Sequence, residues 1–186
     1  LTGGNCAGVS IQYSVRPSFL SLDRVGTAWE STLALLTALA WKVRSMPEEH
    51  RPKILLFGES LGSQAAQDVF VKEGVQGFHI LEIDRALFVG SPYASKWRQQ
   101  WLRDPLGMDP DGIVVEVDSP EEFAALPYPR REQARAILLT HGNDPIPKFG
   151  VRLAIQRPPW LEGDDRPNGV PQDMRFWPLF TFLLVG

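Results

Sequence analysis

The feature that most constrains this chain is a serine between two glycines, placed directly behind a short apolar run. Residues 53–57 read Lys-Ile-Leu-Leu-Phe, and residues 58–62 read Gly-Glu-Ser-Leu-Gly. From residue 63 to residue 71 the apolar residues recur at helical spacing. This order predicts a strand, a sharp turn with Ser60 at its apex, and a helix that starts directly behind the turn.

The Gly-x-Ser-x-Gly spacing is typical of a nucleophile elbow. Such a turn strains the serine backbone, and side chains at positions 58 and 62 would collide with the strand or the helix, so glycine is expected at both. The Ser60 hydroxyl then stands at a helix N-terminus, where the backbone N–H of Leu61 can meet a developing oxyanion. The alternative is a glycine-rich turn in which Ser60 only caps the helix.

Composition places the chain among folded, globular proteins. Its 186 residues fit a single domain, residues 1–186, with one substantial core. With 44% hydrophobic and 22% charged residues, the chain is not of the disordered class. The formal net charge of −3 gives no general attraction to nucleic acid, so no nucleic-acid partner is expected. The arginine-rich residues 129–135 are interpreted as a solvated face.

The single cysteine, Cys6, excludes an internal disulfide and a multi-cysteine zinc site, and we expect it to be a small buried side chain. The chain begins without methionine, which suggests a processed protein or an excised domain. The longest apolar helical stretch, residues 31–43, is too short to span a bilayer. We therefore expect this chain itself to be soluble.

The hydrophobic pattern predicts strands that alternate with helices. Strands are expected at residues 7–14, 53–57, 86–92, 112–117 and 134–140, and helices at residues 23–44, 63–71, 97–103 and 173–185. Because most of the strands are almost entirely apolar, the fold class is α/β, with a mostly parallel sheet covered by helices on both faces. Ligands bind such sheets at the carboxyl ends of the strands. Ser60 and Asp144 both follow predicted strands at that end.

A nucleophilic serine needs a base within hydrogen-bond reach and a third group that orients the base. In chains of this architecture the order is serine, acid, histidine. Asp144 fits the acid position, and the competing interpretation is a turn residue, because Asn-Asp-Pro is good turn chemistry.

All three histidines precede Asp144 in the chain, which departs from the usual order. His50 lies at the amino end of the elbow strand and is interpreted as exposed, and His79 lies in a connection and is interpreted as structural or exposed. His141 lies three residues before Asp144 and is a candidate base, or else a histidine that supports the site without taking the proton.

The sequence offers little for other chemistry. The second oxyanion donor has one candidate, the Thr-Gly-Gly at residues 2–4. The spacing of the acidic residues Glu59, Asp84 and Asp109 does not suggest a metal site. The two glycine-rich nucleotide-binding motifs, GxxxxGK and GxGxxG, are both absent from the sequence. We expect no metal and no cofactor.

Several blocks, taken together, resemble a bacterial α/β-hydrolase family. They occur in the family's order over nearly the whole chain: residues 11–14, 17–21, 57–63, 89–92, 141–146 and 173–178. The resemblance implies that Ser60 takes the nucleophile position and Asp144 the acid position, and His141 matches a histidine that precedes the acid. It also implies membrane association, because relatives carry transmembrane helices ahead of the hydrolase domain. Any contact with a membrane would then come through segments outside this chain.

The family's domain extends further at both ends, and its later part contains a Gly-His-Gly-His-like segment that would supply the base. We therefore expect a fold that is incomplete at both termini, because the chain is a fragment of a larger hydrolase; the alternative is a natural short form that has lost full triad chemistry. The expected function is serine-esterase hydrolysis of a small or lipid-like ester, with an acyl pocket lined by aromatic residues of the last third: Phe149, Trp160, Phe176 and Trp177, with Phe180 and Phe182 better explained as core. The alternatives are a binding or structural module without a complete triad, and an acyltransferase, thioesterase or peptidase on the same site.

Overall fold

The computed structural model describes residues 4–12, 25–92 and 95–140. The elements follow in the order α1 Val25–Arg44, the 3-10 turn η3 Glu48–His50, β1 Ile54–Glu59, α2 Leu61–Asp68, α3 Gln76–Ile80, β2 Ile83–Val89, α4 Lys96–Arg103, α5 Pro105–Met108, β3 Val114–Val117, α6 Pro120–Ala125, α7 Tyr128–Gln133 and β4 Ala136–Leu139. Strands thus alternate with helices, as the sequence predicts.

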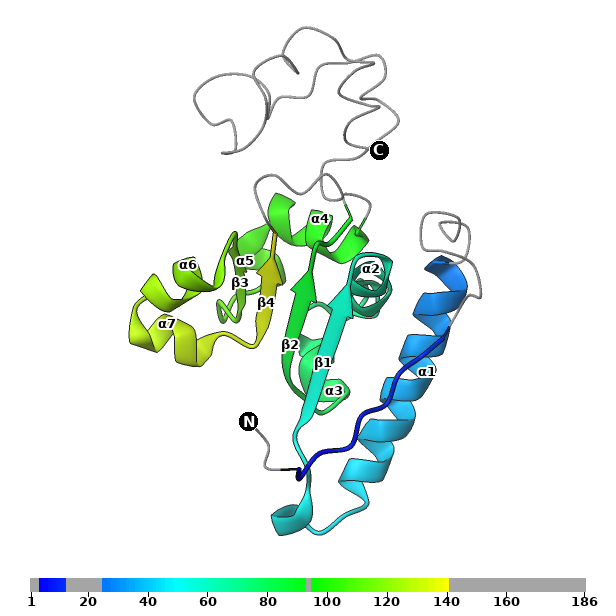
Figure 1. Ribbon diagram of the computed structural model, residues 1–186. Helices are drawn as coiled ribbons and strands as arrows, with labels where there is room; N and C mark the ends of the chain where they lie inside the picture. Colours follow the sequence, from blue (N-terminus) through cyan, green and yellow to red (C-terminus); the bar gives the residue numbers. More distant parts are fainter. Residues whose placement is uncertain (1–3, 13–24, 93–94, 141–186) are drawn as a thin grey trace, which may run out of the picture.

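The four strands form one sheet in the order β1-β2-β4-β3, and every neighbouring pair is parallel. All strands therefore end at the same edge, which we call the carboxyl edge (Figure 1). Ser60 follows β1 at this edge, and Ser91 and Thr140 follow β2 and β4 there. The predicted parallel α/β sheet is confirmed.

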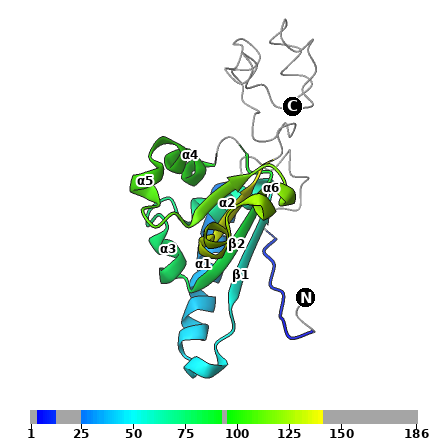
Figure 2. The ribbon, with the colours of Figure 1, turned by 90° about the vertical axis from the view of Figure 1, so that its left-hand side faces the viewer.

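Each strand sends alternate residues to the two faces of the sheet. One face carries Phe88, Val114 and Leu138 in a core that also includes residues of α1, α2, α3 and α4. The other face carries Val115 and Val117, against which Phe123 of α6 packs. Figure 2 shows α6 on the side of the sheet opposite to α3, α4 and α5. Helices therefore lie on both faces, although α6 covers only the end formed by β3 and β4.

The face of β1 that points away from α1 is open to solvent. Leu55 is 68% exposed and Phe57 is 63% exposed, whereas Leu56 between them packs against the core. β1 is also the outermost strand of the described sheet.

The long helix α1 owes its position to its apolar side chains at three- and four-residue steps. Leu36, Ala40 and Val43 are buried, and Leu36 belongs to the core on one face of the sheet. Lys42 and Arg44 occupy the last turn, where cations interact favourably with the helix dipole. Among the residues that the structure describes, no helix is both long and apolar enough to cross a membrane.

Three expectations about the chain are corrected. Residues 7–12 form no strand, because no described strand pairs with them, and Val9 is 60% exposed; residues 13–14 lie outside the described part. Cys6, in the same segment, is exposed rather than buried. The arginines of residues 129–135 are not simply solvated: Arg130 donates to the Val114 carbonyl, and Arg135 donates to two carbonyls at the start of β2.

Candidate active site

Ser60 lies in a strained turn between β1 and α2. Its backbone has φ 53° and ψ −125°, a left-handed conformation that L-residues other than glycine rarely adopt. Its side chain makes no capping hydrogen bond to α2, although Ser60 occupies the N-cap position. The interpretation of Ser60 as a helix cap is therefore wrong. The strain serves no capping purpose, and the half-buried hydroxyl stands at the start of a helix.

The two glycines of the pentapeptide differ in the space around them. A Cβ on Gly58 would lie 2.8 Å from the Cα of Ser63 and 2.9 Å from the carbonyl oxygen of Gly62. Only glycine therefore lets β1 approach the first turn of α2 this closely. A Cβ on Gly62 would meet no described atom within 4 Å. The expected steric requirement holds for Gly58, and no such requirement acts on Gly62 among the described residues.

The first turn of α2 presents donors beside Ser60. Gln64 N–H donates to the Ser60 carbonyl at 3.1 Å, which closes the first helical turn. The N–H of Leu61 comes before this bond and has no partner within the helix, because the first N–H groups of an α-helix lack an acceptor four residues back. Leu61 thus offers an N–H next to the Ser60 hydroxyl, as an oxyanion donor would.

Backbone hydrogen bonds continue across the carboxyl edge beyond the strands themselves. Ser60 N–H donates to the Val89 carbonyl at 3.0 Å, Gly90 N–H to the Leu139 carbonyl at 3.0 Å, and Thr140 N–H to the Val117 carbonyl at 2.9 Å. The turns after β1, β2 and β4 are therefore held side by side. Ser60 and the residue that follows β4 are separated by two strand spacings, roughly 10 Å.

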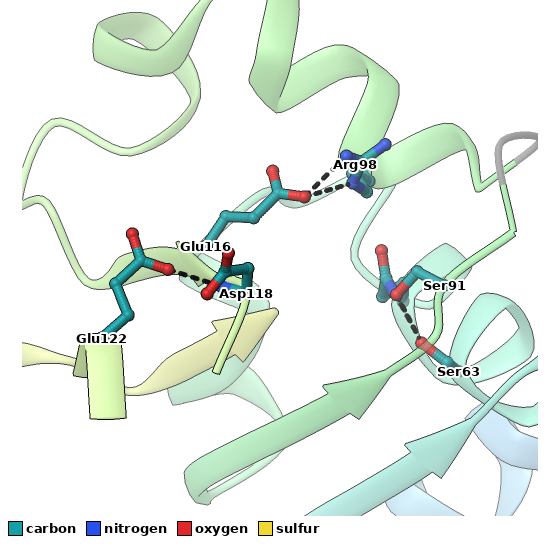
Figure 3. Close-up of polar contacts among 7 residues, drawn as sticks. Ser63, Ser91, Arg98, Glu116, Asp118 and Glu122 are labelled. Atoms are coloured by element: carbon teal, nitrogen blue, oxygen red, sulfur yellow. Dashed lines mark hydrogen bonds and ion pairs between the residues drawn. The ribbon is translucent and has the colours of Figure 1, made fainter. Parts of the chain in front are cut away.

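A buried polar cluster lies behind Ser60. Ser63 and Gln67 of α2 and Ser91 of the turn after β2 are each 0% exposed. The hydroxyl oxygens of Ser63 and Ser91 lie 2.7 Å apart (Figure 3). Gln67 Nε2 donates to both of them. The sequence analysis did not identify this cluster. Its only signal in the sequence is a serine and a glutamine four residues apart, which places them on one face of the predicted helix.

The sequence matches a family described as the alpha/beta-hydrolase family over residues 1–186. The chain belongs to this family. Searches of curated proteins and of solved structures gave no significant match. Family membership supports a hydrolase-like function and agrees with the resemblance and the fold expected from the sequence.

Asp68 is a buried acid that the sequence analysis did not single out. Its carboxylate accepts a hydrogen bond from the Lys96 N–H at 2.9 Å, and its carbonyl accepts one from the Trp29 indole at 2.8 Å. Burial raises the pKa of the Asp68 carboxyl, although backbone hydrogen bonds from Lys96 and Trp97 oppose the shift. Asp68 thus joins α1, α2 and the start of α4 beneath the carboxyl edge.

A charged pair lies further along the carboxyl edge of the sheet. Arg98 of α4 donates through Nε and Nη2 to one carboxylate oxygen of Glu116 in β3, at 3.1 and 2.6 Å (Figure 3). The two side chains are 12% and 22% exposed, so water screens this pair only partly. The pair fixes α4 to the core face of the sheet.

Two of the three histidines of the chain lie away from Ser60. His50 is in η3, ahead of the amino end of β1, and its side chain is 70% exposed. His79 is exposed in α3, ahead of β2, with Nε2 3.2 Å from an Arg135 nitrogen. Both interpretations from the sequence agree with these positions. Neither ring lies at the carboxyl edge.

The remaining candidate site residues fall outside the described part of the chain. These are Asp144, His141, Thr2, Gly3 and the six aromatic residues of the last third. Gly4, described, is exposed with φ 84°. Within the described ranges, no group of three or more histidine, cysteine, aspartate or glutamate side chains is arranged to hold a metal ion. Asp109 instead accepts hydrogen bonds from the N–H groups of Ile113 and Val114 and holds the start of β3.

Proposed function

We propose that this chain is a serine hydrolase that cleaves carboxylic esters, with Ser60 as the nucleophile. The observation that carries the proposal is the backbone of Ser60. A non-glycine residue at φ 53° costs stability, and the Ser60 side chain does not recover that cost by capping α2. Strain of this kind at the end of a strand, next to N–H groups that have no acceptor within their helix, is typical of a presented nucleophile.

The reaction follows from these positions. Ser60 Oγ attacks the ester carbonyl carbon while its proton passes to a histidine, and the carbonyl oxygen becomes an oxyanion beside the Leu61 N–H. The alcohol leaves with the proton from the histidine. Water then attacks the acyl-enzyme by the same route and restores Ser60. Neither step requires a cofactor.

Asp144 is the proposed acid that orients the histidine. It lies four residues beyond Thr140, and Thr140 follows β4, two strands from β1. A separation of roughly 10 Å leaves room for an imidazole between a serine and a carboxylate, because the ring and its two hydrogen bonds take up most of that length. Asp144 would keep the ring in the tautomer that accepts the proton from Ser60.

His141 is the candidate base within these 186 residues. Of the three histidines, it alone follows a strand at the carboxyl edge, directly after Thr140. The alternative source is a histidine beyond residue 186. Lipid-like esters are the proposed substrate class, since the chain after residue 148 is rich in aromatic residues.

The test is covalent labelling of the 186-residue chain with a fluorophosphonate probe, with the modified residue located by mass spectrometry. We expect the label on Ser60 and none on the folded Ser60→Ala variant. A folded wild-type chain that takes no label would overturn the proposal for these residues. Labelling of His141→Gln, against His79→Gln as control, decides the source of the base: lost labelling assigns it to His141, and retained labelling assigns it elsewhere.

A further inference from the structure

The buried cluster of Ser63, Gln67 and Ser91 has a cost in stability. All three side chains are fully buried, and one acceptor, Gln67 Oε1, has no hydrogen-bond partner. An unsatisfied buried acceptor costs about 1–3 kcal/mol, whereas an apolar side chain of similar size would avoid that cost. The cluster therefore does not give the most stable fold, and we look for a role in the geometry that it imposes.

That geometry concerns the nucleophile turn. Ser63 lies one helical turn after Ser60, and Ser91 lies two residues after Val89, whose carbonyl accepts the Ser60 N–H. The start of α2 is thus attached to the turn after β2 at two levels. The backbone bond holds Ser60 itself, and the side-chain cluster holds the next turn of the helix.

The backbone bond and the side-chain cluster together restrain the orientation of α2 more than the backbone bond alone would. A single backbone bond at Ser60 permits α2 to tilt or rotate about that point. The contacts from Ser63 and Gln67 to Ser91 oppose such a rotation, because hydrogen bonds depend steeply on distance and angle. The cluster thereby restrains the orientation of the first turns of α2 relative to the turn after β2.

We propose that Ser63, Gln67 and Ser91 are positioning residues that hold Ser60 and the Leu61 N–H in their reactive arrangement. The inference rests on the proposed function of Ser60. None of the three side chains touches the substrate, since each is fully enclosed by protein. They act through α2, and misplacement of a reacting group by about 1 Å can cost on the order of 100-fold in rate.

The experiment measures how fast the fluorophosphonate probe labels Ser60 as a function of probe concentration. Three variants, Ser63→Ala, Ser91→Ala and Gln67→Met, each remove part of the cluster, and the methionine keeps most of the side-chain volume. Ser95→Ala is a matched control, because Ser95 is also 0% exposed but its hydroxyl has no hydrogen-bond partner. Thermal unfolding of every variant verifies that it is folded at the assay temperature.

We expect the maximal labelling rate to fall about 10- to 100-fold in the three cluster variants, with the half-saturating probe concentration unchanged. Ser95→Ala should label like the wild type. A purely structural cluster would lower the unfolding temperature and leave the maximal rate of the folded protein unchanged, and this result would overturn the inference while the proposed function stood. A wild type that takes no label at all would instead overturn the proposed function, and the inference with it.

Discussion

The Cα of Ser63 lies where only a glycine at position 58 leaves room, since a Cβ there would come within 2.8 Å of it. Gly58→Ala is therefore expected to lower the free energy of unfolding by about 1–3 kcal/mol, as overpacking does in a close-packed interior. Gly62→Ala is the matched control. It meets no described atom within 4 Å and lies in a helix, where alanine is favoured by about 1 kcal/mol. Urea unfolding of both variants tests the pair, and a Gly58→Ala protein as stable as the wild type would contradict the expectation.

The strained backbone of Ser60 is expected to lower the stability of the folded protein. Ser60→Gly is expected to raise the free energy of unfolding by about 1 kcal/mol or more, because glycine adopts φ 53° without a steric penalty. Ser60→Ala keeps the Cβ and should bring no such gain. Both variants should lose fluorophosphonate labelling. Chemical denaturation measures the difference, and equal stability of the glycine and alanine variants would show that the turn is not strained.

The parallel sheet and the serine turn could be predicted from the sequence because each has a local signal. Each of β1, β2, β3 and β4 is rich in apolar residues, and the glycine–serine spacing marks the turn itself. The segment of residues 7–12 also alternates apolar and polar residues, yet it forms no strand. Strand pairing depends on a partner, and alternation alone does not reveal whether one exists.

The polar contacts behind the site could not be predicted, because they join residues far apart in the chain. Ser63 and Ser91 are 28 residues apart, and Asp68 meets Lys96 over the same separation. Each of these residues, taken alone, resembles a surface residue of a helix or a loop. Their burial follows from the packing of α2 between α1 and α4, which is a tertiary property with no short-range pattern.

The raised pKa of Asp68 predicts how stability depends on pH. Because the folded state holds the Asp68 proton more tightly than the unfolded state, Asp68 weakens folding as pH rises from the ordinary value of 3.8 through its folded pKa. Below pH 3.8 Asp68 is protonated in both states and brings no loss of stability. Above its folded pKa the carboxyl is ionised in both states, and the full loss of stability has occurred. Relative to Asp68→Asn, the wild type should therefore lose stability as pH rises through this range.

Urea unfolding of the wild type and of Asp68→Asn between pH 3.5 and pH 7, roughly the range in which a buried carboxyl titrates, measures that difference. The asparagine retains an acceptor for the Lys96 N–H, so the comparison isolates the charge. A difference that stays constant across the range, or that grows in favour of the wild type, would contradict the raised pKa.

The ion pair of Arg98 and Glu116 should contribute more to stability than the other arginine–carboxylate pair of the described residues, Arg44 and Glu82. The first pair has side chains 12% and 22% exposed, whereas the second has side chains 50% and 33% exposed. Glu116→Gln leaves a mostly buried guanidinium without its counter-charge, which is expected to cost about 1–3 kcal/mol, below the 3–5 kcal/mol typical of full burial. Glu82→Gln should cost less than about 1 kcal/mol, because solvent screens an exposed pair. Denaturant unfolding at low and at high salt compares the two, and only the Glu82 variant should lose its effect in salt. Equal costs in the two variants would show that α4 is held to the sheet by its apolar contacts alone.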